Sequence, residues 1–143
     1  MAIVVTGTPG TGKTTYARDL AKKLHYEYLD LKEFGQAALA MVGRDTQRDA
    51  DIIDEKKLVA ALKRAIQKNP RVVIDGHFSH EIPPKYVEKC IVTRCAINEL
   101  RKRLDARGYK KEKIEENIQA EIFDTCGQEA RELGHTVEEV WTG

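Results

Sequence analysis

Short, mostly apolar runs recur along this chain, separated by segments with helical periodicity. Residues 2–5, 72–74 and 90–93 form three such runs, and runs of this kind are typical of strands buried on both faces of a parallel sheet. Residues 26–29 alternate as a further strand does, and residues 136–141 form a strand-like run near the end of the sequence. The pattern therefore predicts five strands.

Apolar residues recur at helical spacing in the segments between these strands. The pattern predicts helices over residues 17–24 and 51–68, the second of them ended by an Asn-Pro pair. Asn98 is expected to cap a helix, and a last helix is expected over residues 114–133. Strands that alternate with helices predict an α/β fold, with a parallel sheet covered on both faces. No internal repeat or linker divides the chain, so we expect a single domain over residues 1–143.

The composition fits one globular domain and argues against nucleic acid and membranes as partners. Hydrophobic residues make up 41% of the 143 residues and charged residues 33%. Because 24 Lys and Arg stand against 23 Asp and Glu, the formal net charge is only +1, and binding of nucleic acid through overall charge is not expected. The three cysteines lack C-x-x-C spacing and are expected to be reduced, structural thiols. No apolar run has membrane-spanning length, so no membrane partner is expected and the cytoplasm is the expected location.

Residues 7–15 read GTPGTGKTT and match the phosphate-binding pattern G-x-x-x-x-G-K-[ST]. Glycines let the backbone curve so that successive N–H groups point at an anion, and the helix that follows adds the positive end of its dipole. In such a loop Lys13 reaches the outer phosphates of a nucleotide, and the Thr14 hydroxyl ligates Mg²⁺. A chance glycine-rich turn is the alternative. The position between a buried strand and an amphipathic helix favours nucleotide binding.

The second candidate feature is the sequence DGHFSH at residues 75–80, which directly follows an apolar run. Ligands of parallel sheets gather beyond the carboxyl ends of the strands, so Asp75 is expected to hold Mg²⁺ directly or through a water molecule. The alternative is a helix cap or a turn. His77 can fix a water for attack on a terminal phosphate, hold Asp75 in position, or contact an acceptor phosphate. His80 is expected to be structural or on the surface.

Arginines are the candidate partners for the remaining phosphate charges. Arg103 and Arg107 lie one helical turn apart, next to the hinge-capable Gly108, so both can close over bound phosphates. The alternative for this pair is a solvated basic face. The candidate contacts for an acceptor phosphate are Arg44, Arg48, Arg94 and Arg103. Solvation at the surface explains each of them as well.

With these residues placed, the chain resembles the nucleoside monophosphate kinases, and most closely the adenylate kinase isoenzyme 6 family. The resemblance rests on the loop at residues 7–15, on the D-x-H motif at residues 75–77, and on RLDARGYKKEKIEENIQAEIF at residues 103–123. It covers nearly the whole chain. It implies a P-loop NTPase three-layer sandwich with a parallel five-stranded sheet, an acceptor-binding insert at about residues 30–53 and a short lid at about residues 106–116.

The resemblance also implies the residues that contact ATP, which are Gly10, Gly12, Lys13, Thr14, Thr15 and Arg107. Those expected to take part in catalysis are Lys13, Asp75, His77 and Arg107, with Mg²⁺ at Thr14 and Asp75. Ordinary adenylate kinases carry D-G-F-P-R, whereas here His77 follows Asp-Gly and no arginine comes soon after. The chain also ends at Gly143, where relatives usually continue into a final helix, so one face of the sheet is expected to be less well covered.

Three functions remain open. The resemblance implies an enzyme that converts ATP and AMP into two ADP with Mg²⁺, has ATPase activity, and acts in maturation of the small ribosomal subunit. An alternative of a different class is a nucleotide-driven assembly switch, which binds and releases a small-subunit ribosomal protein on a pre-ribosomal particle. A kinase for another small acceptor is the third, because P-loop cores serve many substrates. An acidic groove for a protein partner, or else merely a solvated helix face, is expected from Glu115, Glu116, Glu121, Glu129 and Glu132.

Overall fold

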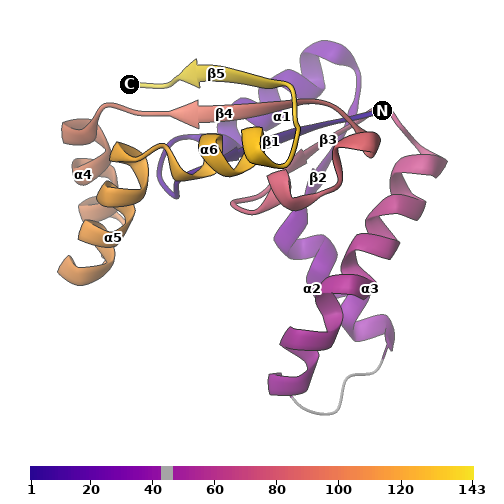
Figure 1. Cartoon of the computed structure of the whole chain (residues 1–143). Helices are drawn as coiled ribbons and strands as arrows, with labels where there is room; N and C mark the ends of the chain where they lie inside the picture. Colours follow the sequence, from indigo (N-terminus) through magenta and orange to yellow (C-terminus); the bar gives the residue numbers. More distant parts are fainter. Residues whose placement is uncertain (43–46) are drawn as a thin grey trace.

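Five parallel strands form the sheet at the centre of the structure (Figure 1). The computed structural model describes the backbone of residues 1–42 and 47–143, and the side chains of residues 1–37 and 56–143. The strands are β1 (Ala2–Gly7), β2 (Glu27–Asp30), β3 (Val72–Asp75), β4 (Val87–Arg94) and β5 (Val137–Trp141). They lie in the order β2-β3-β1-β4-β5. The predicted parallel five-stranded sheet is confirmed.

The central strand β1 determines where a ligand can bind. Val5 pairs with Asp75 of β3 on one side and with Ile91 of β4 on the other, so the residues that follow β1 and β3 emerge at the same edge of the sheet. Ligands of α/β sheets bind at this edge, where the strand order changes direction. β4 extends beyond the predicted residues 90–93 because it pairs with β1 along one edge and with β5 along the other.

Helix α1 (Lys13–Leu24) covers one face of the sheet. Its buried residues Ala17 and Ala21 pack against a cluster from the three central strands, which consists of Ile3, Val5, Val73 and Ile91. Because alanine side chains are small, the helix lies close to the strands. Because α1 packs this closely, the beginning of the helix lies at the carboxyl edge of β1.

Two helices cover the opposite face of the sheet. The part of α3 (Gln47–Lys68) whose side chains are described contributes Leu62 and Ile66, and α6 (Thr125–Glu132) contributes Cys126 and Ala130. They pack on the strand residues Val4, Ile74, Cys90 and Val92. Each fully buried Leu or Ile contributes about 1.5–3 kcal/mol relative to exposure. With α1 on the other face, the three-layer arrangement is confirmed.

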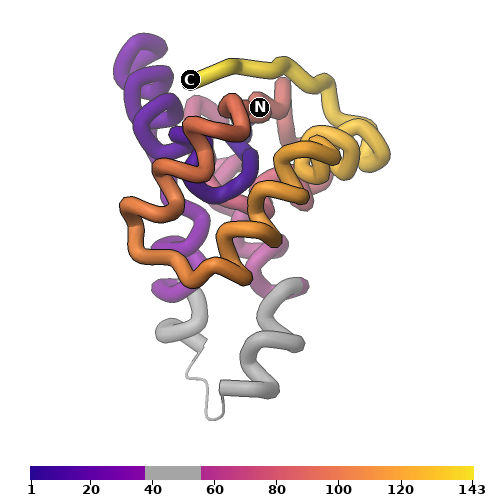
Figure 2. The backbone as a smooth tube through the Cα atoms, turned by 90° about the vertical axis from the view of Figure 1, so that its left-hand side faces the viewer, coloured from indigo at the N-terminus to yellow at the C-terminus, as the bar shows by residue number. Residues whose placement is uncertain are grey.

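Two further helices form a hairpin at the carboxyl end of β4, and we call residues 97–122 the lid hairpin. It consists of α4 (Ile97–Ala106) and α5 (Lys111–Ile122), held together by a third apolar cluster of Cys95, Leu100, Leu104, Ile114 and Ile118. Its tip is the turn at Gly108, where φ is +78° and an added Cβ would meet no atom within 4 Å. Figure 2 shows the two helices of the hairpin running side by side, in orange. The predicted lid at residues 106–116 covers the tip of this hairpin and stays a prediction.

Two helix predictions were wrong. The helix expected over residues 114–133 is broken at Asp124, whose φ of 52° and ψ of 46° are left-handed, so α5 ends at Ile122 and α6 begins at Thr125. Asp tolerates this conformation better than most residues do. Asn98 also does not cap α4, because the helix begins at Ile97 and Ala96 occupies the cap position.

Helix α2 (Leu31–Val42) follows β2 directly and packs along α3. The Asp30 carboxylate accepts the Glu33 N–H at 3.1 Å, which satisfies one of the free donors at the beginning of the helix. The predicted acceptor-binding insert at residues 30–53 includes this helix. Arg44 and the side chain of Arg48 lie outside the described residues. No helix within residues 1–42 and 47–143 is both long enough and apolar enough to cross a membrane.

Candidate active site

The phosphate-binding loop is the turn that joins β1 to α1. Gly7 has φ +150°, and a Cβ there would lie 2.5 Å from the Thr93 hydroxyl oxygen. Gly10 has φ +92°, and its Cβ would lie 2.9 Å from Leu100 Cδ1. Both positions therefore require glycine, for the backbone conformation and for the close approach of β4 and the lid hairpin. Thr11 closes the turn, since its hydroxyl donates to the Thr8 carbonyl at 2.6 Å and its N–H donates to the same oxygen at 3.2 Å.

Lys13 lies at the first position of α1, where a helix presents free N–H groups to an anion. Its Nζ donates to the Thr8 carbonyl at 3.5 Å. Burial lowers the pKa of Lys13 below its usual value, the nearby Asp75 carboxylate opposes that shift, and the charge of Arg107 adds to it. Its surroundings thus lack one strong counter-charge, which a bound phosphate would supply.

Asp75 ends β3 beside the loop and is 3% exposed. Its Oδ2 accepts the Thr14 hydroxyl at 2.8 Å and the Tyr28 hydroxyl at 2.7 Å. Burial, together with the bond to Asp75, raises the pKa of Tyr28 to about 12. The structure thus brings together the two residues predicted to hold Mg²⁺. Tyr28 was not predicted, because its role depends on β2 lying next to β3 in register.

The donor set fits Mg²⁺, a hard cation that prefers a few carboxylate or hydroxyl oxygens and completes its shell with water and substrate phosphates. Among the side chains of residues 1–37 and 56–143, no three His, Cys, Asp or Glu residues converge as a metal site of their own. A magnesium ion at Thr14 and Asp75 would therefore need phosphate oxygens as well. This is the arrangement expected for an ion that arrives with a nucleotide.

His77 lies beside the phosphate-binding loop, half-buried. Its Nδ1 donates to the Gly7 carbonyl at 3.0 Å, because a carbonyl oxygen can only accept. Burial lowers the pKa of His77, and the charge of Lys13 adds to that shift. At neutral pH the ring is therefore uncharged, and its Nε2 is left as a hydrogen-bond acceptor. As expected, His80 is structural: it is 1% exposed, with Thr6 and Glu129 on its two ring nitrogens.

The three predicted phosphate-binding arginines whose side chains are described occupy different surroundings. Arg107 is exposed at the end of α4. Arg103 donates to the Gly10 carbonyl at 3.1 Å and to the Thr142 carbonyl at 2.9 Å, which places it against the phosphate-binding loop. Arg94 is paired with Glu121, Asp124 and Glu139. Burial acts to lower the pKa of Arg94, but the bond and charge of Glu121, with Asp124, outweigh it, and the pKa is raised.

Glu121 was expected in a surface groove, and this was wrong. Its side chain is 2% exposed, and it contacts the phosphate-binding loop through the Thr8 hydroxyl at 3.0 Å. The sequence at residues 117–121 gave no indication of this contact, because a glutamate near a helix end is usually solvated. Two other members of the predicted groove are paired within the chain, Glu129 with His80 and Glu115 with Arg101.

Comparison with known proteins identifies the family to which this chain belongs. A family model described as an AAA domain matches residues 3–124. A protein of Pyrococcus abyssi named "Putative adenylate kinase" is 42% identical over 143 residues, which is 99% of this chain and 75% of that protein. The adenylate kinase isoenzyme 6 homolog of Caenorhabditis elegans is 34% identical over 131 residues, 91% of this chain and 72% of that protein. This chain belongs to the adenylate kinase isoenzyme 6 family.

Within the adenylate kinase isoenzyme 6 family, the yeast homolog FAP7 of Saccharomyces cerevisiae is 37% identical over 131 residues, 91% of this chain and 66% of that protein. Solved structures with less sequence identity share the fold. Shikimate kinase from Acinetobacter baumannii in complex with shikimate superposes with a TM-score of 0.59 at 16% identity, over 99% of this chain and 84% of that one. TT1252 from Thermus thermophilus superposes with a TM-score of 0.62 at 21% identity, over 100% and 89% of the chains. These two structures show the shared fold; the identity to the adenylate kinase homologues is what makes the protein a member of a P-loop kinase family.

Proposed function

We propose that this protein is an adenylate kinase that transfers a phosphoryl group from ATP to AMP to give two ADP, and that it also hydrolyses ATP. The observation that carries the proposal is the meeting of Lys13, Thr14 and Asp75 at the carboxyl edge of β1 and β3. The names of the relatives, adenylate kinases in several organisms, support ATP and a nucleoside monophosphate as the substrates.

The residues proposed to bind ATP have roles that follow from their chemistry. The backbone N–H groups of Gly10, Gly12 and Thr15 would hold the phosphates, and Lys13 would meet the outer ones with its charge. When bound at Thr14 and Asp75, Mg²⁺ supplies positive charge that neutralises phosphate oxygens and orients them. Arg107, at the tip of α4, would cover the phosphates when the hairpin closes and exclude water.

The acceptor nucleotide is proposed to bind between the site and helices α2 and α3. Its phosphate would be bound by Arg44 and Arg48, with Arg94 and Arg103 as further candidates. In the described structure the guanidinium groups of Arg94 and Arg103 already have partners within the chain. They would therefore have to exchange those partners to reach an acceptor. This makes Arg44 and Arg48 the first choice for mutation.

The ATPase activity is proposed from His77. Its neutral ring, fixed through Nδ1 to the Gly7 carbonyl, leaves Nε2 free to accept a hydrogen from a water molecule near the loop. A water held there would compete with AMP for the terminal phosphate. His77→Ala is expected to lower ATP hydrolysis by about a hundredfold, the lower end of the range that general acid–base groups contribute, and to leave transfer to AMP less affected.

The kinase proposal is tested by measuring ADP formation from Mg·ATP with AMP, with CMP and without an acceptor. AMP is expected to accelerate ADP formation strongly, and Lys13→Ala to abolish the acceleration because it removes the charge at the outer phosphates. Lys22→Ala, an exposed lysine in the last turn of the same helix, is the matched control and should change little. Equal rates with and without AMP would reject the kinase and leave the ATPase.

A role in maturation of the small ribosomal subunit is proposed alongside the enzymatic activity. It is supported by the resemblance and by Phe78, which is 55% exposed and packs against the His77 ring, with 4.3 Å between the ring centroids and the ring planes tilted by 50°. A protein partner that covered Phe78 would also touch a residue of the site. The measurement is binding of purified small-subunit ribosomal proteins in the presence of Mg·ATP or Mg·ADP. If the affinity for the ribosomal protein is the same with Mg·ATP and Mg·ADP, the proposed nucleotide-driven assembly switch is rejected.

A further inference from the structure

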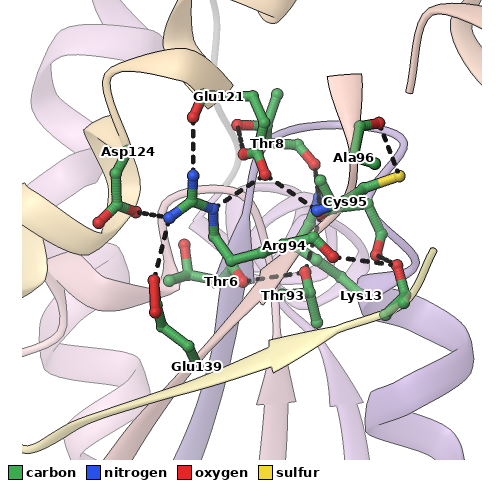
Figure 3. Close-up of polar contacts among 12 residues, drawn as sticks. Thr6, Thr8, Lys13, Thr93, Arg94, Cys95, Ala96, Glu121, Asp124 and Glu139 are labelled. Atoms are coloured by element: carbon green, nitrogen blue, oxygen red, sulfur yellow. Dashed lines mark hydrogen bonds and ion pairs between the residues drawn. The ribbon is translucent and has the colours of Figure 1, made fainter. Parts of the chain in front are cut away.

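The carboxylate of Glu121 is buried and joins three segments of the chain. Its Oε1 accepts the Thr8 hydroxyl at 3.0 Å, and its Oε2 accepts the Arg94 Nε at 2.9 Å and the Cys95 N–H at 3.0 Å. Its backbone carbonyl accepts the Arg94 Nη2 at 2.9 Å. Figure 3 shows these bonds converging on Glu121 and Arg94. A buried charge is costly unless it is fully paired, and here both carboxylate oxygens have partners.

The three segments are the residues just before α4, the end of α5 and the phosphate-binding loop. Cys95 lies two residues before α4 begins, Glu121 lies in the last turn of α5, and Thr8 lies in the loop. One carboxylate therefore ties the bases of both lid helices to the loop. Further along α4, Arg103 also contacts the loop, through its bond to the Gly10 carbonyl at 3.1 Å. At the tip of the hairpin, a Cβ added at Gly108 would meet no atom within 4 Å.

The same contact lies close to the residue that would meet the phosphates. Thr8 donates its hydroxyl to Glu121 and accepts Lys13 Nζ, at 3.5 Å, with its carbonyl. Lys13 is thus two hydrogen bonds away from α5. When a phosphate draws the ammonium away from the Thr8 carbonyl, the hydrogen bonds of Thr8 that remain among the described residues are those with Glu121 and Thr11.

We propose that Glu121 is a positioning residue, which holds Thr8 in the phosphate-binding shape of the loop and sets the base of the lid hairpin against it. The proposal rests on the proposed binding of Mg·ATP and goes beyond it, because it assigns the affinity in part to a residue that touches no nucleotide. Loss of the Thr8–Glu121 bond should loosen the loop and disconnect it from α5. A residue with only a structural role would change stability and leave the nucleotide affinity as it was.

Trp141 gives a spectroscopic readout of this network. It is the only tryptophan of the sequence, and the Arg94 guanidinium lies 5.1 Å from its ring centroid. Since Arg94 bonds to Glu121, a change at Glu121 during binding should alter the surroundings of the indole and its emission. Trp141 is 60% exposed, so such a change would be visible against a mostly solvated baseline.

The test compares three proteins, namely the wild type, Thr8→Val and Thr8→Ser. Valine has the shape of threonine without the hydroxyl donor, and serine keeps the donor. Calorimetric titration with Mg·ATP is expected to give a dissociation constant raised about tenfold in Thr8→Val, the scale of one hydrogen bond to a charged group, and raised no more than about twofold in Thr8→Ser. At saturating Mg·ATP, the emission of Trp141 is expected to change in the wild type and in Thr8→Ser. The change is expected to be smaller in Thr8→Val.

The outcomes separate this inference from the proposed function. If the wild type binds Mg·ATP and Thr8→Val binds it equally well, the positioning role of Glu121 is overturned and nucleotide binding stands. Equal emission changes in all three proteins, or no change in any, would also overturn it. If the wild type binds no Mg·ATP, the proposed function fails and this inference with it. Glu121→Gln is a second variant, expected to weaken binding like Thr8→Val; its melting temperature shows whether it is folded.

Discussion

Thr14 and Asp75 face each other across the carboxyl edge of the sheet, with 2.8 Å between the hydroxyl oxygen and Oδ2. They are 61 residues apart in the sequence and come from α1 and β3, yet the pairing of Val5 with Asp75 fixes their approach. This contact is the one on which a magnesium site depends. It joins the beginning of α1 to the end of β3 at the point where phosphates would enter.

Replacing Asp75 with asparagine is expected to raise the Mg²⁺ concentration needed for turnover and to lower turnover by about a hundredfold, the scale of loss when one preorganised electrostatic contact is removed from an active site. The amide keeps the shape and loses the charge. The measurement is ATP turnover against Mg²⁺ concentration. Asp105→Asn, on the exposed face of α4, is the control. A Mg²⁺ dependence equal to that of the wild type would show that Asp75 holds no metal.

Replacing Tyr28 with phenylalanine removes the other donor to Asp75, the hydroxyl at 2.7 Å. The free energy of unfolding is expected to fall by about 1–2 kcal/mol, because the bond goes to a buried carboxylate. Urea denaturation measures this change. Tyr26→Phe, a hydroxyl deletion two residues earlier, should cost less. A spectrophotometric titration should also lose the tyrosine whose pKa burial and the bond to Asp75 raise to about 12, and equal titrations of the two proteins would contradict the contact.

Replacing Gly10 with alanine is expected to damage both stability and nucleotide binding. The backbone has φ +92°, and the new Cβ would lie 2.9 Å from Leu100 Cδ1, so the loop and α4 must separate. Gly134→Ala is a matched control, since φ there is +95° but the nearest atom is 3.9 Å from the added Cβ. Both variants should lose about 1–2 kcal/mol of stability through backbone strain.

Only Gly10→Ala should also raise the Mg·ATP dissociation constant, because it alone displaces the phosphate-binding loop. We expect a rise of about tenfold or more, which corresponds to about 1.4 kcal/mol of binding free energy. Calorimetry on the two variants measures this difference. Equal affinities for Mg·ATP would mean that the packing of the loop against Leu100 has no part in binding.

Acid is expected to destabilise the protein through its buried histidines. Burial lowers the pKa of His135 below the unfolded value of 6.5, so the unfolded chain binds a proton at a higher pH than the folded protein does. The stabilisation is therefore complete above about pH 6.5 and is lost as the pH falls through the lower, folded pKa. His77 has a shift of the same sign.

The measurement is the free energy of unfolding at several pH values between 7 and 5. His135→Gln keeps a side-chain donor for the His80 carbonyl, which His135 Nε2 contacts at 2.7 Å, and should show a shallower decline. His25→Gln, an exposed position, should keep the wild-type slope. A slope unchanged by His135→Gln would contradict the assignment.

The fold could be predicted from the sequence to the extent that its signals were local. The apolar runs of β1, β3 and β4, and the glycines and lysine of the loop, each act within a few residues, so their pattern was sufficient. The break at Asp124 could not be predicted, because apolar residues keep a helical spacing across it, from Ile118 to Ala130. The direction change there depends on the ion pairs of Asp124 with Arg94 and Arg131, which are contacts made only in the folded chain.

The site divides in the same way. Lys13, Thr14 and Asp75 were predicted because each follows a strand in a recognisable pattern. Tyr28 and Glu121 were missed because their roles come from neighbours distant in the sequence, at Asp75 and at Thr8. A tyrosine in a strand and a glutamate in a helix look ordinary until the register of β2 and the path of α5 are known.

The burial of all three cysteines has a practical consequence. Burial raises the pKa of Cys90 to about 12 and that of Cys126 to about 11, and it also raises the pKa of Cys95. Thiols that are both covered and protonated react slowly with maleimide dyes, because the thiolate is the nucleophile. A single cysteine introduced at the exposed Ala106 should therefore take a fluorophore selectively, without removal of any native thiol, and allow the proposed closure of the hairpin to be tested by energy transfer.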